Sequence, residues 1–202
     1  GADWTFGRFP IQFTKWTLKK IDVDSYTENW KTDDGNYYVD GGKAAWTWGS
    51  VDLTAFAGKN NGNSDKYNYV ARPFDDNAAF GNLQDPVQSA GLRAQFPVGS
   101  TKWGLTVISA GEGNTATTLY DNAYVWGADV AFPVGSWKWT AAYTQSNTSA
   151  AEGSAAKKVD AKNDAWEVAT NGALFGLDFD LGYKSIAPNF SAPGDWGKIG
   201  YW

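Results

Sequence analysis

The sequence predicts an all-β fold, an antiparallel up-and-down transmembrane β-barrel of about ten strands. Apolar and polar side chains alternate along most of the chain, which is the pattern of strands with two different faces. Very short connections alternate with long polar ones, as in barrels whose turns and loops lie at opposite ends. The alternating segments also have about the length that a tilted strand needs to cross a bilayer.

The clearest alternation lies in the C-terminal part of the chain. From residue 175 to residue 184, Phe, Leu, Phe, Leu and Tyr alternate with Gly, Asp, Asp, Gly and Lys. A strand with this period of two presents all of its apolar side chains on one face. Similar patterns predict strands at residues 3–9, 42–49, 51–59, 89–96, 101–110, 123–132, 136–145, 164–171, 173–185 and 195–202. Their even number agrees with a bacterial barrel, either complete or part of a larger one.

Tight turns join these strands in pairs. We predict them at Gly49 and Ser50, at residues 97–100 and 133–136, and at Asn171 and Gly172. The motif Phe-Pro-Val-Gly-Ser occurs at residues 96–100 and again at 132–136, as a weak internal repeat of a hairpin. Longer polar connections separate the pairs. The chain is therefore interpreted as a single barrel domain over residues 1–202, with an inward loop around 10–40 and a long loop at 60–88.

The composition excludes several classes of chemistry. The chain has no Cys, no His and no Met, which excludes disulfides, Cys/His metal sites and His-dependent catalysis. A formal charge of −5, from 17 basic and 22 acidic residues, is unlike the basic surface of a nucleic-acid-binding protein. We therefore expect no enzymatic activity, no catalytic residue, no cofactor and no metal site. Residues 33–36 and Asp40 nevertheless carry oxygen ligands of the kind that Ca²⁺ binds.

The apolar face of the strands has two interpretations. A soluble β-sandwich would bury it and carry many charges on the other face, whereas here the other face is mostly small and mixed. Trp and Tyr lie close to the predicted strand ends, which is typical of the aromatic girdles of membrane barrels. The main hypothesis is therefore that the apolar face contacts lipid. The alternatives are a soluble extracellular β-sandwich, a carbohydrate-binding module using Trp16, Trp30 and Trp196, or a structural module of the cell envelope.

The N-terminal part of the chain carries a family resemblance. It rests on Phe-Gly-Arg-Phe-Pro-Ile-Gln-Phe at 6–13, on residues 16–26, on Thr-Asp-Asp-Gly-Asn-Tyr-Tyr-Val-Asp-Gly-Gly at 32–42, and on residues 51–60. Over about residues 1–60 the chain resembles the barrel region of bacterial outer-membrane porins whose chains carry an S-layer-homology domain. The resemblance implies passive diffusion of small solutes or ions through a water-filled pore, without catalysis. The S-layer-homology domain and coiled coil expected before the barrel are absent from this sequence, so a cell-wall tether and the completeness of the chain stay open.

A lipid-facing apolar face assigns the intervening charged side chains to the pore. Five are basic and five are acidic, so they give little net ion selectivity, and each could instead form a structural cross-strand pair. The predicted pore-lining residues are Lys43, Asp52, Arg93, Lys102, Asp129, Lys138, Glu167, Asp178, Asp180 and Lys184.

The segment from residue 22 to residue 40 is rich in acidic side chains. If it folds into the lumen, it forms a constriction that makes the pore mildly cation-preferring, because acidic rings favour cations. The alternative is a solvated external loop. The expected partners are outer-membrane lipid and small solutes or ions, and not nucleic acid, with assembly into a homo-oligomer left open. The candidate constriction residues are Asp22, Asp24, Glu28, Asp33, Asp34 and Asp40.

Overall fold

A computed structural model of the chain describes residues 1–14, 16–17, 19–22, 34–59, 88–111, 120–150, 163–187 and 190. The regular secondary structure of these residues is entirely β, as the alternation predicts. The strands are β1 (Ala2–Ile11), β2 (Lys19–Asp22), β3 (Asp34–Trp48), β4 (Val51–Lys59), β5 (Gln88–Val98), β6 (Thr101–Gly111), β7 (Tyr120–Val134), β8 (Trp137–Ala150), β9 (Asp164–Leu174) and β10 (Leu177–Ile186).

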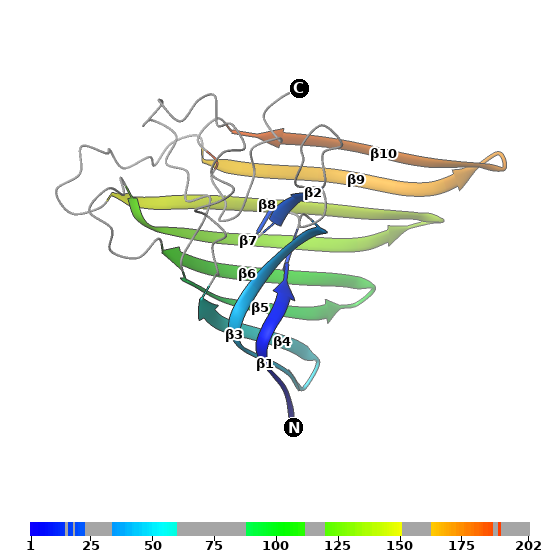
Figure 1. Cartoon of the computed structure of the whole chain (residues 1–202). Helices are drawn as coiled ribbons and strands as arrows, with labels where there is room; N and C mark the ends of the chain where they lie inside the picture. The colour runs from blue at the N-terminus through cyan, green and yellow to red at the C-terminus, as the bar shows by residue number, and fades with distance from the viewer. Residues whose placement is uncertain are drawn as a thin grey trace.

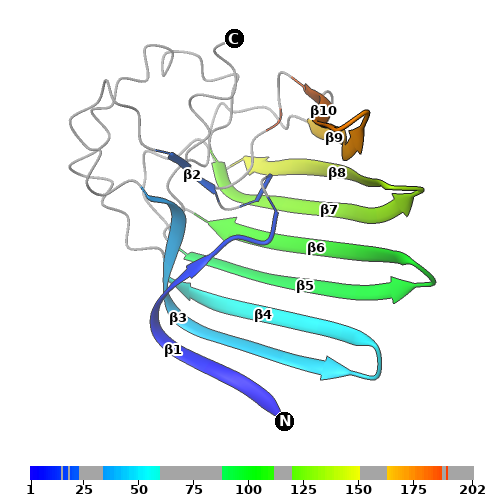
Figure 2. The same ribbon diagram turned by 90° about the vertical axis from the view of Figure 1, so that its right-hand side faces the viewer.

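The strands form one antiparallel sheet in the order β1-β3-β4-β5-β6-β7-β8-β9-β10, and β2 pairs with β3 beside this path (Figure 1). Figure 2 shows that the sheet is twisted, because β9 and β10 are seen almost end-on while β4 to β8 lie across the view. The all-β antiparallel prediction is thus confirmed. Within the described residues β1 and β10 are the two free edges of an open sheet, so closure into a barrel stays a prediction.

The strand boundaries differ from the predictions mainly in the N-terminal part. We expected a loop around residues 10–40, but β2 lies within it and β3 begins at Asp34. The first half of β3 is ordered by its pairing with β1, in which Val39 lies opposite Phe9. Both side chains are buried, so their packing outweighs the flexibility of the adjacent glycine pair at 41–42. The predicted strand at 195–202 lies outside the described residues.

Three of the four predicted turns are confirmed as two-residue Gly-Ser turns. The first residue of each turn, Gly49, Gly99 or Gly135, has a φ of 60° to 62°, and the following serine does not have a positive φ. A positive φ at the first central residue alone is the pattern of a type II′ turn, which favours Gly there. The repeated Phe-Pro-Val-Gly-Ser motif therefore encodes the end of one strand and the turn that follows it.

The fourth predicted turn, at Asn171 and Gly172, is wrong. Leu174 pairs with Leu177, so the turn lies at Phe175 and Gly176, whose φ angles are 53° and 76°. Asn-Gly favours a hairpin turn locally. In the fold, however, Gly172 lies within β9, where an added Cβ would come within 2.6 Å of the Trp137 ring. The glycine is required by the packing of this Trp, and not by a turn.

The hairpins are displaced along the strands by a constant amount. Asp52, Lys102 and Lys138 are the second residues of β4, β6 and β8, and each pairs with the residue three positions before the end of the next strand. Each hairpin therefore extends two residues beyond the previous one, and Figure 1 shows the tips advancing from β3–β4 to β9–β10. A regular stagger of this kind is the shear that strands need in order to tilt around a barrel axis.

A small apolar core covers one face of the sheet, which we name the inner face. It consists of Phe9, Ile11, Val39, Phe56, Ile108 and Val125, with Phe13 and Phe190 packed against it. Phe13 follows β1 and meets the ring of Phe56 edge-on, with ring centroids 5.5 Å apart. Gly91 leaves room for this contact, because an added Cβ would lie 2.5 Å from Phe56 and 3.1 Å from Phe13. The segment after β1 is thereby held against the inner face.

Candidate functional site

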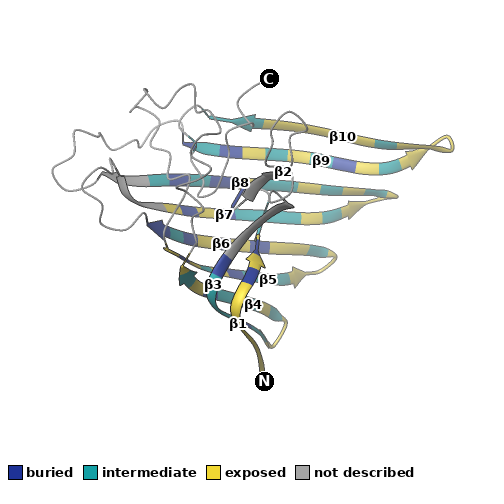
Figure 3. Cartoon of the chain, in the orientation of Figure 1, coloured by how far each residue is buried: buried dark blue, intermediate teal, exposed yellow. Residues whose placement is uncertain are grey.

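The face opposite this core, named the outer face, exposes large apolar side chains on every strand of the main sheet except β4. Figure 3 shows exposed residues recurring along the strands, and the exposed fractions reach 65% for Trp4, 75% for Phe6 and 77% for Trp48. A continuous exposed apolar surface of this kind marks an interaction site. Its further members include Leu92, Val98, Trp103, Leu105, Val107, Tyr124, Trp126, Val134, Tyr143, Trp166, Val168, Leu174, Leu177, Leu181 and Tyr183.

Aromatic side chains gather towards the two ends of the outer face. Near the loops, Trp126 lies against Tyr143 and Trp166 against Tyr183, with ring centroids 5.6 Å and 5.3 Å apart. Near the turns lie Trp48, Trp103, Trp137 and Trp139, while mainly Ala, Val and Leu occupy the middle, with Trp4 as an exception. Aromatic girdles on both sides of an aliphatic band are the lipid-facing pattern of membrane barrels.

Charged side chains on the outer face are confined to its loop end. Among the side chains that the structure describes on this face, the charged ones are Arg8, Asp40, Lys59 and Asp164. Asp164 to Leu174 spans about 33 Å along β9, at about 3.3 Å a residue. With a tilt of about 40° the height of the band is about 25 Å, which matches the apolar band of a membrane barrel.

The inner face carries all ten charged residues that were predicted to line a pore. The strand register places them on this face, as alternates of the exposed apolar residues. Several make structural contacts: Asp52 accepts a hydrogen bond of 2.8 Å from Thr47, and Lys43 lies 5.5 Å from the ring centroid of Phe9. Lys184 is directly opposite Glu167 in the ladder. That these residues line a water-filled pore remains a prediction.

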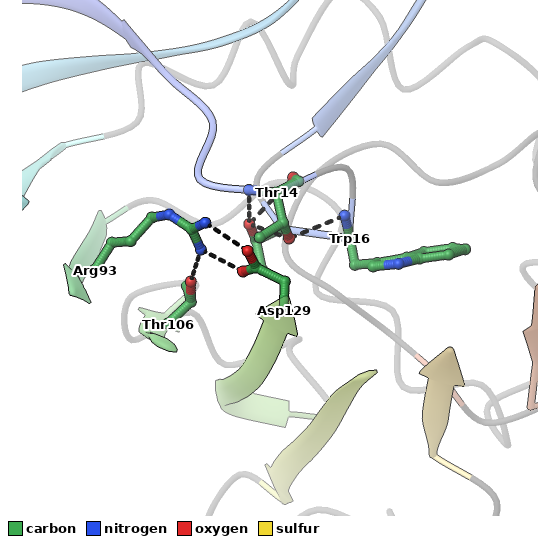
Figure 4. Close-up of polar contacts among 6 residues, drawn as sticks. Thr14, Trp16, Arg93, Thr106 and Asp129 are labelled. Carbon is green, nitrogen blue, oxygen red and sulfur yellow. Dashed lines mark hydrogen bonds and ion pairs between the residues drawn. The ribbon is translucent and has the colours of Figure 1, made fainter. Parts of the chain in front are cut away.

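The best-defined polar contact on the inner face joins β5, β6 and β7. Arg93 donates two hydrogen bonds to the carboxylate of Asp129, of 2.7 Å and 2.9 Å, and a third of 2.7 Å to Thr106 (Figure 4). The Arg93 side chain is only 10% exposed. A buried guanidinium needs this bidentate partner, because an unpaired charge in such surroundings is costly. The sequence predicted both residues on this face, but not their pairing.

A compact turn follows β1 on the inner side. The backbone N–H groups of Trp16 and Thr17 donate to the side-chain and backbone oxygens of Thr14, at 3.2 Å and 3.1 Å (Figure 4). Trp16 is 2% exposed and meets Phe190 edge-on at 6.2 Å. The suggestion that Trp16 offers an exposed platform for sugars is therefore wrong. Trp30 and Trp196 lie outside the described residues.

The candidate constriction residues are described only in part. Asp24, Glu28 and Asp33 lie outside the described residues, and Asp22 and Asp34 are paired in the β2–β3 ladder. The assignment of Asp40 to the constriction is corrected. Asp40 follows the buried Val39 in β3, and because side chains alternate along a strand, it lies on the outer face. There its carboxylate binds Arg8 at 2.8 Å and 2.9 Å. The long loop predicted at 60–88 also lies outside the described residues, except for Gln88.

The class of protein follows from these two faces, because a staggered antiparallel sheet with an exposed apolar side and a polar inner side is the architecture of β-barrel domains. The family model described as "S-layer protein SlpA, beta-barrel domain" matches residues 22–201, and the chain belongs to this family. The family confirms the predicted relation to S-layer proteins and places the chain at the cell envelope. No curated protein and no solved structure matches the chain. No helix in the described part has the length and hydropathy needed to cross a membrane.

Proposed function

We propose that this domain is a structural module of the cell envelope that is embedded in the outer membrane through the outer face of its sheet. The observation that carries the proposal is the exposed apolar band between two aromatic zones, in which the charged side chains that the structure describes lie only at the loop end. In water this surface would be a strong driver of aggregation, whereas hydrocarbon solvates it without cost. The apolar core on the inner face would give the embedded sheet its rigidity.

Quenching of Trp fluorescence tests this proposal. The purified chain is reconstituted into vesicles of phosphatidylcholine that carries bromine atoms at defined depths of the acyl chains. Because most outer-face Trp residues lie near the two ends of the band, we expect stronger quenching by shallow than by deep bromines. A chain that stays monodisperse without detergent, and whose fluorescence brominated lipid leaves unchanged, would contradict membrane embedding.

A second candidate function is passive diffusion of small solutes or ions, as in a porin. It is supported by the gathering of all ten predicted charged residues on the inner face, since lumen-facing positions of membrane barrels are polar. The apolar core occupies part of the same face on β1, β3, β4, β6 and β7, so passage would have to run beside this core. Planar-bilayer recordings test it: discrete conductance steps are expected, and membranes that contain the inserted domain but stay silent would exclude diffusion.

A further inference from the structure

Three charged residues form a row across the loop end of the outer face. Arg8 of β1 is directly opposite Asp40 of β3, and Asp40 is directly opposite Lys59 of β4. On these three strands they are the first charges met on the outer face when moving from the turns towards the loops. The row therefore lies where the apolar band ends, at the depth of lipid headgroups in an embedded domain.

The charges in this row do not cancel. Arg8 uses Nε and Nη2 to bind both carboxylate oxygens of Asp40, and its side chain is still 56% exposed. Lys59 is exposed and makes no ion pair within the described part of the chain. The row thus carries one net positive charge, although the whole chain has a formal charge of −5. An exposed cation at the edge of a lipid-facing surface attracts an anionic group.

The surface next to the row is apolar. One pleat nearer the turns, Phe6 lies beside Arg8 on β1 and Ala57 lies beside Lys59 on β4. Phe6 is highly exposed and stacks on Trp4, with ring centroids 5.9 Å apart and an interplanar angle of 3°. An occupant that satisfies both regions needs an anionic oxygen next to a hydrocarbon chain. Inorganic phosphate would satisfy only the charges, and an apolar peptide only the rings.

We infer that Arg8 and Lys59 bind the phosphate-bearing headgroup of an anionic phospholipid, whose acyl chain lies along Phe6 and Trp4. This inference rests on the membrane-embedded function proposed above. Arg8 can bind the phosphate through Nη1, which its pair with Asp40 leaves available, and Lys59 binds it as a mobile point charge. Asp40 orients Arg8 and at the same time limits the affinity for the anion.

Lipid selection by the purified domain tests the inference. The chain is held in micelles with equal amounts of phosphatidylglycerol and phosphatidylcholine, and the bound lipids are counted by native mass spectrometry. We expect phosphatidylglycerol to be enriched, and Lys59→Gln to lower this enrichment about fivefold, the effect of losing one cation near a lipid surface. Asp40→Asn should raise it. The matched control is Lys102→Gln, which removes the same charge from the inner face near the turns. It should leave the enrichment of phosphatidylglycerol unchanged.

Three results would overturn the inference. An equal loss of phosphatidylglycerol in the Lys59 and Lys102 variants would reveal a bulk charge effect. Displacement of the lipid by millimolar inorganic phosphate would reveal a site for free anions. Equal binding of both lipids by a domain that brominated lipid still quenches would remove the headgroup site and leave the membrane function standing. By contrast, the absence of quenching would refute the membrane function itself. Far-UV circular dichroism of each variant verifies that its β-structure is retained.

Discussion

The guanidinium of Arg93 reaches the carboxylate of Asp129 by passing over Gly104, which lies on the strand between them. Gly104 pairs with Asp129 in the β6–β7 ladder. A Cβ at this glycine would lie 2.5 Å from Nη2 of Arg93 and 2.6 Å from both carboxylate oxygens. The ion pair therefore requires a residue without a side chain at this position, although the glycine does not have a positive φ.

The first prediction is that Gly104→Ala destabilises the domain by breaking this ion pair. Leaving the largely buried Arg93 with a poorer partner should cost about 1–3 kcal/mol of unfolding free energy. Gly182→Ala is the control, because an added Cβ on β10 comes no closer than 3.5 Å to another atom. Urea unfolding in detergent micelles measures the free energy of unfolding of both variants. Equal stability of the two variants would mean that the pair contributes nothing.

The second prediction separates the two faces of β7. Val130→Arg places a charge in the apolar band, and should destabilise the inserted domain by about 2–4 kcal/mol if it lies at mid-bilayer depth. Ala131→Arg places the same charge one residue further on, on the exposed inner side. It lies opposite Lys102 there, and this repulsion should cost less than about 1 kcal/mol. Unfolding from lipid vesicles gives both free energies. The assignment of the faces fails if both substitutions are equally harmful or equally harmless.

The third prediction concerns the turn between β9 and β10. Phe175 is 93% exposed and has a φ of 53°, a left-handed conformation that is costly for a Phe. Phe175→Asn creates the Asn-Gly pair that a turn with two positive φ angles favours, and should stabilise the domain by about 1 kcal/mol. Thermal unfolding provides the measurement, with Val98→Asn at the end of β5 as a control outside any positive-φ position. A lower melting temperature for the Phe175 variant would show that the positive φ of Phe175 does not destabilise the domain.

The fourth prediction concerns ion selectivity and applies to the diffusion hypothesis. Acidic side chains in a narrow constriction raise the local cation concentration, so a mild cation preference is expected at 0.1 M salt. Changing Asp33 and Asp34 to Asn should abolish it, and 1 M salt should nearly do so, because the Debye length falls from about 10 Å to about 3 Å. Reversal potentials in planar bilayers measure the preference. A zero or anion-directed potential for the unmodified chain would place the acidic segment outside the pore.

Alternation along the sequence was sufficient to assign the faces of the strands. The period of two is a local property of extended backbone, so every predicted pore-lining residue lies on the same face. Gly-Ser turns are also local, and the three turns of this type were placed correctly. The turn at Phe175 and Gly176 was missed because the local preference of Asn-Gly competes with the packing of Trp137 over Gly172.

Contacts between distant parts of the chain could not be predicted from the sequence alone. The pairing of Arg93 with Asp129 depends on the register of three strands and on the small size of Gly104. The burial of Phe13 and Trp16 depends on the path of the chain after β1, which the sequence described only as an inward loop.

The sequence by itself therefore determined the class of fold, the two faces of its strands and most of its tight turns, because alternation and turn geometry act over a few residues. The tertiary structure decided which charges meet, and it moved Asp40 from a supposed constriction to the outer face beside Arg8. It also decided the stagger of the hairpins. Register is fixed by side chains that come together from distant strands, and a shift of one residue along β3 would exchange its two faces.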